Sequence, residues 1–198
     1  MRAIFFDLDG TLLDFEQEYA DLLADAVEAV GAEATDDAIE TYSEAFYDSF
    51  AACDPDPIRA GFAATDLDPD PGALADALLA REAEACRTPE EADAVLSRLT
   101  DEYALGVLTN GLREWQLEKL RASGIAEHFD AVVASYEAGA HKPDPEPFRL
   151  AEERLPADEY AMVGDSDADV AGARDAGWIA RRYDGGGFDD LPGALDWQ

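Results

Sequence analysis

The chain has few cysteine, histidine and lysine residues, and it has no long uninterrupted hydrophobic run. Its 198 residues include only two cysteines, Cys53 and Cys86, and two histidines. The cysteines are far apart and lack a Cys-x-x-Cys spacing, so we expect neither a zinc site nor a Cys–His nucleophile. Two reduced, buried thiols are the simpler expectation, although the sequence alone leaves a disulfide between them open.

Basic residues are also scarce. The chain has 46 acidic and 14 basic residues and a formal net charge of −32, and the only lysines are Lys119 and Lys142. No basic cluster is present to meet phosphate groups, so nucleic acids and anionic membranes are not expected as partners. The acidic residues are spread along the predicted helices, a composition typical of proteins from extreme halophiles, in which concentrated salt screens the repulsion.

Two further absences bear on location. No apolar segment is long enough to cross a membrane. The N-terminus lacks the charged, apolar and small-residue zones of a signal peptide. We therefore expect a soluble cytoplasmic protein.

Hydrophobic spacing predicts an N-terminal strand followed by helices. Residues 2–7 form a short apolar run that is typical of a buried strand. Further along, apolar residues recur every three or four positions, which predicts amphipathic helices, one of them capped by Thr35. Two proline-rich breaks follow, and further helices are expected at about 71–86 and 89–100. Residues 15–98 are therefore predicted to be all helical.

Beyond residue 98, strand patterns alternate with helix patterns. Strands are predicted at 103–110, 130–135, 160–165 and 178–183, and helices at 113–123, 145–154 and 168–177. Apolar strands joined by helices predict a parallel sheet with helices on both faces. We expect an α/β, Rossmann-like core formed by residues 1–14 and 99–198. The helical segment 15–98 is too long for a simple crossover, so we expect it to be an inserted domain.

Polar residues follow several of the predicted strands where each strand ends. Asp7 follows the first strand, Thr109 and Asn110 end the second, and Asp165 ends the strand before the last helix. Ligands bind at the carboxyl ends of the strands in open parallel sheets, so these side chains should converge there. The loop after the third strand would add the ammonium group of Lys142.

The pair Asp7 and Asp9 is unusual because two like charges lie at the end of an apolar run. Carboxylates that converge without Cys or His ligands favour a hard cation such as Mg²⁺. A bound Mg²⁺ would neutralise the repulsion between the carboxylates. The sequence therefore predicts a magnesium site.

Four short motifs resemble those of the haloacid dehalogenase-like hydrolase superfamily. They are Asp7-Leu8-Asp9-Gly10-Thr11, then Thr109, then Lys142-Pro143, and finally Gly164-Asp165 with Asp169. Their order and spacing agree over about the whole chain. The helical insertion after the first motif is similar to the cap of the phosphoglycolate phosphatase-like members.

The resemblance implies a role for each motif residue. Asp7 would be the nucleophile that forms an aspartyl-phosphate, and Asp9 would be the general acid and base. Gly10 would let backbone N–H groups approach the phosphate. Thr109 and Asn110 would bind the phosphoryl group, and Lys142 would balance its charge.

The same resemblance implies the ligands of Mg²⁺. They would be the Asp7 carboxylate, the Asp9 backbone carbonyl and Asp165, with Asp169 binding directly or through water. Asp169 could instead be a charge favoured by the helix dipole. We expect Ser166 to be a capping residue and His141 to have a structural role in its loop.

The function implied is a Mg²⁺-dependent phosphatase acting on a small phosphomonoester. Relatives that cleave carbon–halogen bonds lack the second acid, so Asp9 argues against that reaction. A phosphonate-cleaving relative needs a lysine in the cap, and residues 15–98 contain none. A phosphosugar mutase and a non-catalytic Mg²⁺- and phosphate-binding module remain as alternatives. The sequence does not set the substrate or the oligomeric state; Arg59, Arg81 and Arg87 are candidate specificity residues in the cap.

Overall fold

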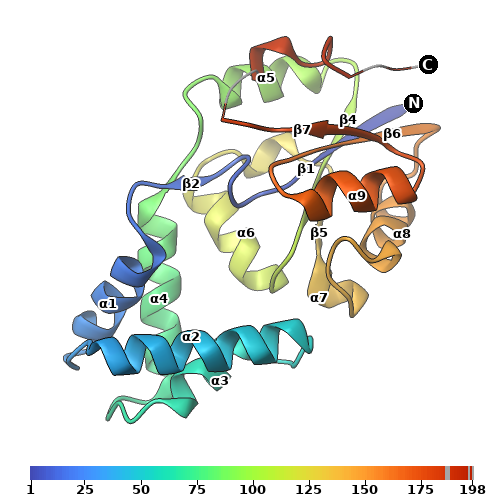
Figure 1. The fold of residues 1–198 in the computed structure, drawn as a ribbon. Coiled ribbons are helices and arrows are strands. Elements are labelled where there is room, and N and C mark those ends of the chain that lie inside the picture. Colours follow the sequence, from blue (N-terminus) through green and yellow to red (C-terminus); the bar gives the residue numbers. More distant parts are fainter. Residues whose placement is uncertain (186–187, 196, 198) are drawn as a thin grey trace. The chain divides into compact units, whose positions relative to one another are not determined.

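The computed structural model describes residues 1–185, 188–195 and 197. Within them, five parallel strands form one sheet in the order β5-β4-β1-β6-β7 (Figure 1). The strands are β1 (Arg2–Phe6), β4 (Ala104–Thr109), β5 (Ala131–Ala134), β6 (Glu159–Gly164) and β7 (Ile179–Arg182). Helices flank this sheet, so the prediction of an α/β, Rossmann-like fold is confirmed.

The helices that accompany the sheet follow the predicted alternation. They are α5 (Ala92–Leu99), α6 (Arg113–Ala122), α7 (Ser135–Ala138), α8 (Pro145–Arg154) and α9 (Asp167–Asp175), with the short 3-10 turns η1 (Ala126–His128) and η2 (Phe188–Asp190). The bounds of α8 agree with the predicted helix at 145–154. The single-turn helix α7 was not predicted.

The sheet has an apolar core on each face because its side chains alternate in direction. On one face, Phe5 packs in a cluster with Phe148 of α8 and with Trp178, whose ring lies 5.2 Å from that of Phe5. On the other face, Phe6 stacks on Phe188 of η2, with 6.1 Å between the ring centroids. A strand that is buried on both faces is typically a continuous apolar run, as residues 3–6 are.

The chain divides into two compact units. One comprises Met1–Asp14 and Arg87–Gln198, and the other comprises Phe15–Cys86. The predicted boundary at residue 98 differs from this division because α5 belongs with the sheet. Arg98 of α5 donates hydrogen bonds to the carbonyls of Asp189 and Leu191, at 3.4 and 2.6 Å.

The Phe15–Cys86 unit is built from helices. They are α1 (Tyr19–Ala29), α2 (Asp36–Ala51), α3 (Pro57–Ala64) and α4 (Pro71–Ala85). Thr35 caps α2 by accepting the N–H of Ala38, as predicted. The helix α3 was not predicted, and it packs Phe62 against Tyr42 of α2 with the ring centroids 4.4 Å apart. Two short strands, β2 (Asp14–Phe15) and β3 (Cys86–Arg87), pair with each other.

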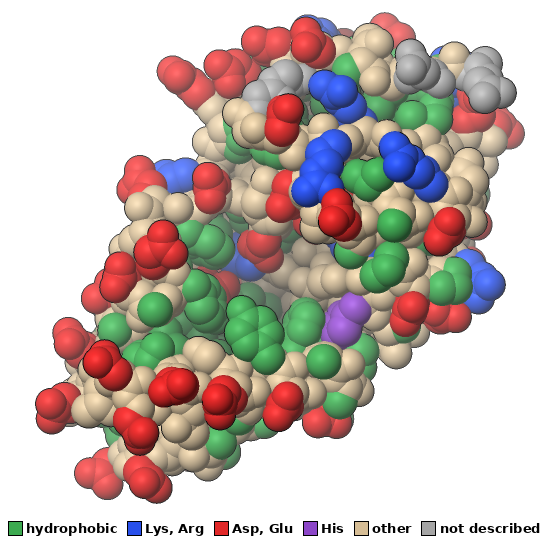
Figure 2. Space-filling view, viewed as in Figure 1, with side chains coloured by type: hydrophobic (Ala, Val, Ile, Leu, Met, Phe, Trp, Pro, Cys, Tyr) green, Lys and Arg blue, Asp and Glu red, His purple; other side chains and the backbone are tan. Residues whose placement is uncertain are grey.

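Three further observations concern the cysteines, membrane-spanning segments and the distribution of acidic residues. No disulfide joins Cys53 and Cys86; Cys86 is buried and Cys53 is partly buried. Within the described part of the chain, no helix is both long and apolar enough to span a membrane. Carboxylates are spread over the visible surface of both units and are not gathered in one block (Figure 2).

Candidate active site

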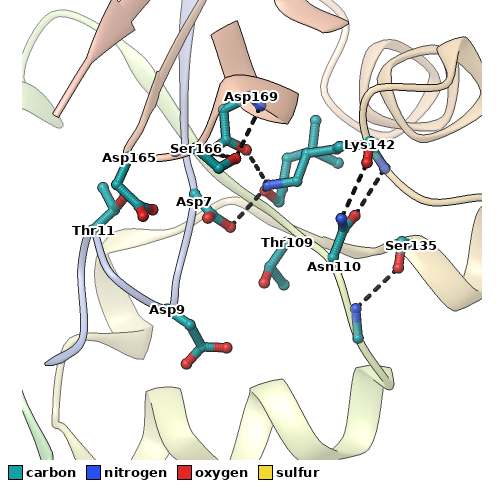
Figure 3. A network of polar contacts seen from close by, with 12 residues as sticks. Asp7, Asp9, Thr11, Thr109, Asn110, Ser135, Lys142, Asp165, Ser166 and Asp169 are labelled. Carbon is teal, nitrogen blue, oxygen red and sulfur yellow. Dashed lines mark hydrogen bonds and ion pairs between the residues drawn. The ribbon is translucent and has the colours of Figure 1, made fainter. Parts of the chain in front are cut away.

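The carboxyl ends of three adjacent strands bring the predicted motif residues together (Figure 3). Phe6 of β1 pairs with Val107 of β4 and with Val163 of β6. The next residue, Asp7, continues the pairing by donating its backbone N–H to the carbonyl of Val163. The side chains that follow these strands therefore share one edge of the sheet, as the sequence predicts.

Lys142 is the cationic centre of this edge. Its Nζ lies 2.8 Å from Oδ1 of Asp7, 2.5 Å from Oδ1 of Asp169 and 2.7 Å from the carbonyl oxygen of Leu108. All three side chains that carry charge here are buried. A buried ammonium group is tolerated only with close partners of opposite charge, and two carboxylates provide them.

Burial and charge act in opposite directions on this group of residues. Burial raises the pKa of Asp7, the nearby ammonium of Lys142 lowers it and the charge of Asp169 raises it, with a net pKa of about 6. Burial lowers the pKa of Lys142, but the carboxylates of Asp7 and Asp169 outweigh burial and raise it above its ordinary value. Lys142 therefore stays charged. Asp7, in contrast, takes up a proton more readily than an ordinary aspartate does.

Three carboxylates form a group that could hold a metal ion. Oxygen atoms of Asp7, Asp165 and Asp169 all lie within 4.8 Å of one another. Thr11 donates its hydroxyl to Oδ1 of Asp165 at 3.1 Å. Three carboxylates against one lysine leave an excess of negative charge, and oxygen donors alone suit a hard divalent cation. The donor set therefore fits the predicted Mg²⁺.

Gly10 makes room for this carboxylate group. Its φ is +82°, and a Cβ at this position would lie 2.8 Å from the carboxyl carbon of Asp165. Both the backbone conformation and the close approach exclude a side chain. The glycine of the first motif is thus required where the chain turns beneath Asp165.

Asp169 lies at the start of α9 and has contacts on two sides. Its Oδ2 accepts hydrogen bonds from the backbone N–H and the hydroxyl of Ser166, at 3.0 and 2.6 Å. In return, Ser166 accepts the N–H of Asp169 at 3.2 Å, which completes a capping box at the start of α9. Ser166 is the predicted capping residue. The other oxygen of Asp169 faces Lys142, so the helix start and the charged centre are tied together.

Asn110 fixes the loop that carries Lys142. Its Oδ1 accepts the backbone N–H of Lys142 at 2.9 Å, and its Nδ2 donates to the backbone carbonyl of Lys142 at 3.3 Å. The neighbouring Gly111 donates its N–H to Oγ of Ser135, which also contacts Nδ1 of His141 at 2.7 Å. This contact agrees with the structural role that we expect for His141.

Asp9 lies apart from the Lys142 centre and contacts the second lysine of the chain, Lys119, which was not among the predicted site residues. Nζ of Lys119 lies 2.6 Å from Oδ1 and 2.7 Å from Oδ2 of Asp9. Nε2 of Gln116 lies 3.0 Å from Oδ2 of Asp9 and 3.3 Å from Oγ1 of the buried Thr109. Both new residues are on α6. The only feature of the sequence that could have pointed to Lys119 is the rarity of lysine. The chain has two lysines, and they contact the two acids of the first motif.

The comparisons with known proteins agree with this arrangement. The family model described as haloacid dehalogenase-like hydrolase matches residues 1–177. A phosphoserine phosphatase from Thermus thermophilus is 47% identical over 85 residues, which cover 39% of this chain and 34% of that protein. The match therefore spans about a third of that relative's length.

Two longer matches extend over most of the chain. The pyrophosphatase PpaX from Halalkalibacterium halodurans is 29% identical over 183 residues, or 89% of this chain and 80% of the relative. The structure of the HAD-hydrolase YfnB from Bacillus subtilis, bound to magnesium, aligns with a TM-score of 0.71 and 26% identity, covering 90% of this chain and 86% of YfnB. The sheet, the order of the motifs and the family match lead to one conclusion: the chain belongs to the haloacid dehalogenase-like hydrolase family.

Proposed function

We propose that this protein is a Mg²⁺-dependent phosphatase that hydrolyses a small phosphomonoester through an aspartyl-phosphate on Asp7. The observation that carries the proposal is the separation of the two acids of the first motif. Asp7 is buried against Lys142, whereas the Asp9 side chain is 37% exposed and contacts Lys119. Two carboxylates in such different surroundings can take different parts in one reaction.

In the first step, a carboxylate oxygen of Asp7 attacks phosphorus and the bond from phosphorus to the ester oxygen breaks. Asp9 gives a proton to the departing oxygen, which leaves as an alcohol. Lys142 offsets negative charge beside Asp7 while the phosphoryl group is transferred. The hydroxyl of Thr109 orients a phosphoryl oxygen, whereas the side-chain amide of Asn110, predicted to bind phosphate, instead holds the backbone of Lys142 in place.

In the second step, water attacks phosphorus and loses a proton to Asp9. The bond from phosphorus to the Asp7 oxygen then breaks, which releases inorganic phosphate and restores the carboxylate. Asp7, Asp165 and Asp169, together with the Asp9 backbone carbonyl, would hold Mg²⁺. When bound, Mg²⁺ supplies positive charge that stabilises the phosphoryl oxygens and the Asp7 carboxylate.

We also propose that the helical unit Phe15–Cys86 acts as the cap that selects the substrate. Two of the candidate arginines form ion pairs with nearby acids of the same unit. Arg59 pairs with Asp56, the N-cap residue of α3, at 3.4 Å, and Arg81 pairs with Glu84 at 2.8 Å. Both pairs are solvent-exposed and cost little to break, so either arginine remains available to a substrate carboxylate or second phosphate.

The test is a panel of small phosphate esters, including phosphoglycolate, sugar phosphates, nucleoside monophosphates and pyridoxal phosphate, assayed with Mg²⁺ in molar KCl. We expect hydrolysis of at least one ester, loss of activity in EDTA, and recovery with Mg²⁺ in preference to Ca²⁺. Rigid carboxylate ligands favour the smaller octahedral ion. Full activity after exhaustive chelation, or no hydrolysis across the panel, would contradict the proposal.

A further inference from the structure

The second lysine of the chain, Lys119, lies on α6 together with Gln116. The two residues are three positions apart, so their side chains leave the helix on the same face. Together they contact both carboxylate oxygens of Asp9, with the three distances between 2.6 and 3.0 Å. A lysine that contacts both oxygens, supported by an amide on one of them, restricts the rotation of the Asp9 carboxylate.

Lys119 is more deeply buried than the carboxylate that it contacts. Its side chain is only 4% exposed, whereas that of Asp9 is 37% exposed. Moving an ammonium group out of water costs free energy unless close partners of opposite charge offset it, and Asp9 is such a partner. The buried ammonium group is thereby held in place against the more exposed carboxylate of Asp9.

Gln116 extends the restraint to the second motif. Its Nε2 also lies 3.3 Å from Oγ1 of Thr109 and 3.1 Å from the backbone carbonyl of Asn110. A Cβ on the next residue, Gly111, would lie 2.7 Å from the same nitrogen, so the glycine leaves space for this amide. The side chain that moves protons and the hydroxyl that faces the phosphoryl group are therefore held by one amide.

We propose that Lys119, assisted by Gln116, is a positioning residue that holds the Asp9 carboxylate for its two proton transfers. The inference rests on the proposed phosphatase function. In the first transfer a proton passes from Asp9 to the ester oxygen as its bond to phosphorus breaks. In the second, a proton passes from the attacking water to Asp9 as the bond from phosphorus to Asp7 breaks. Lys119 itself touches neither reacting atom in this scheme.

Comparing two leaving groups distinguishes a loss of proton transfer by Asp9 from a general loss of active-site structure. p-Nitrophenolate leaves without a proton, so formation of the aspartyl-phosphate from p-nitrophenyl phosphate needs little help from Asp9. An alkoxide needs a proton in order to leave. Hydrolysis of the aspartyl-phosphate needs Asp9 with either substrate.

The experiment compares Lys119→Met with wild type on p-nitrophenyl phosphate and on the best alkyl phosphate of the panel. We expect kcat for the alkyl phosphate to fall by about 100-fold, within the usual contribution of a general acid or base. With p-nitrophenyl phosphate, Lys119→Met should release about one p-nitrophenolate per active site at nearly the wild-type rate, followed by a slow steady state. Lys119→Arg should recover part of the alkyl phosphatase activity.

The matched control is Arg121→Met. It removes one positive charge from the same helix, and Arg121 is exposed and pairs with Glu118 at 3.5 Å. This variant should keep both activities within about twofold of wild type. Thermal unfolding in molar KCl checks that each variant is folded, and if Lys119→Met is not, Gln116→Leu is expected to give the same split to a smaller degree.

Two results would overturn the inference. One is a Lys119→Met enzyme with alkyl phosphatase activity within threefold of wild type. The other is a Lys119→Met enzyme in which the alkyl phosphatase activity and the rate of the p-nitrophenolate burst fall equally. If Gln116→Leu is used in place of an unfolded Lys119→Met, equal losses in these two quantities would overturn the inference in the same way. A wild-type protein that hydrolyses neither substrate would overturn the phosphatase proposal as well, which separates the two failures.

Discussion

Lys142 is the residue on which the charge balance of the site depends. Its ammonium group is buried between Asp7 and Asp169. Lys142→Met keeps much of the side-chain volume and leaves two buried carboxylates without their cation. We expect a loss of about 3–5 kcal/mol in the free energy of unfolding, the range for breaking a buried ion pair.

The measurement is urea unfolding in molar KCl with EDTA, which removes any stabilising metal. Adding Asp169→Asn to Lys142→Met should restore part of the loss, because one of the two unpaired carboxylates becomes neutral. A Lys142→Met protein as stable as wild type would contradict the charge balance described above.

Asp7 should give a distinct pH dependence of stability in the metal-free protein. Burial raises its pKa from 3.8 to about 6 in the folded state. The folded protein therefore binds this proton more tightly than the unfolded chain. The contribution of Asp7 to stability is fully present below about pH 4 and is lost as the pH rises through about 6.

The check is the free energy of unfolding of wild type minus that of Asp7→Asn, measured in EDTA from acidic to neutral pH. The shift corresponds to a decline of about 3 kcal/mol in this difference. A difference that stays constant would mean that folding does not shift the pKa of Asp7, and a difference that rises with pH would mean that folding lowers this pKa.

Among the elements, α9 connects local stability with the site. Ser166 caps this helix, and its hydroxyl and N–H both reach Asp169. Ser166→Ala should cost about 1 kcal/mol of stability, as the loss of an N-cap usually does. It should also lower the apparent affinity for Mg²⁺ severalfold, because Asp169 loses one of the contacts that orient it.

The matched variant is Thr35→Ala, which removes the N-cap of α2 in the other compact unit. A similar loss of stability is expected there, without a change in Mg²⁺ dependence. If the two variants changed the Mg²⁺ dependence equally, the link between the α9 cap and the metal ligands would be wrong.

Some helices and strands were predictable from the sequence and others were not. The five strands of the sheet and the helix α8 were predictable because the apolar period changes clearly from one segment to the next, whereas the short strand β3 lies inside the segment predicted to be all helical. Asp7, Thr109 and Asp165 could be placed together because the ends of parallel strands share one edge. The helix α3 was missed because its eight residues lie between two proline-rich breaks.

Lys119 and Gln116 required the three-dimensional structure. Strand order says which ends meet, but it does not say which side of α6 faces the first motif. The placement of α5 with the sheet was also missed, because its contacts with the carbonyls of Asp189 and Leu191 join segments about 90 residues apart. Contacts of this kind leave no periodic signal.

At the scale of the whole molecule, the dominant property is charge. The formal net charge is −32 over 198 residues, and carboxylates are scattered over the visible surface (Figure 2). Their repulsion in dilute buffer should cost several kcal/mol, which is comparable with the stability of a domain. Raising the salt from about 0.1 M to about 1 M shortens the screening length from about 10 Å to about 3 Å.

We therefore expect the melting temperature to rise steeply with KCl, and activity to be lost below a few tenths molar and regained when salt is added. The measurement is the melting temperature from about 0.1 M to about 3 M KCl. A flat curve would mean that the acidic surface is tolerated without salt. The halophilic interpretation would then fail, even if the phosphatase proposal stood.

The central claim is that Asp7 becomes covalently bound to phosphorus, and Asp7→Asn tests it most directly. The amide is nearly isosteric with the carboxylate but cannot form the acyl phosphate. Turnover of p-nitrophenyl phosphate, with Mg²⁺ in molar KCl, should fall to background in Asp7→Asn while its thermal unfolding stays cooperative. Turnover within tenfold of wild type in the folded variant would contradict the account.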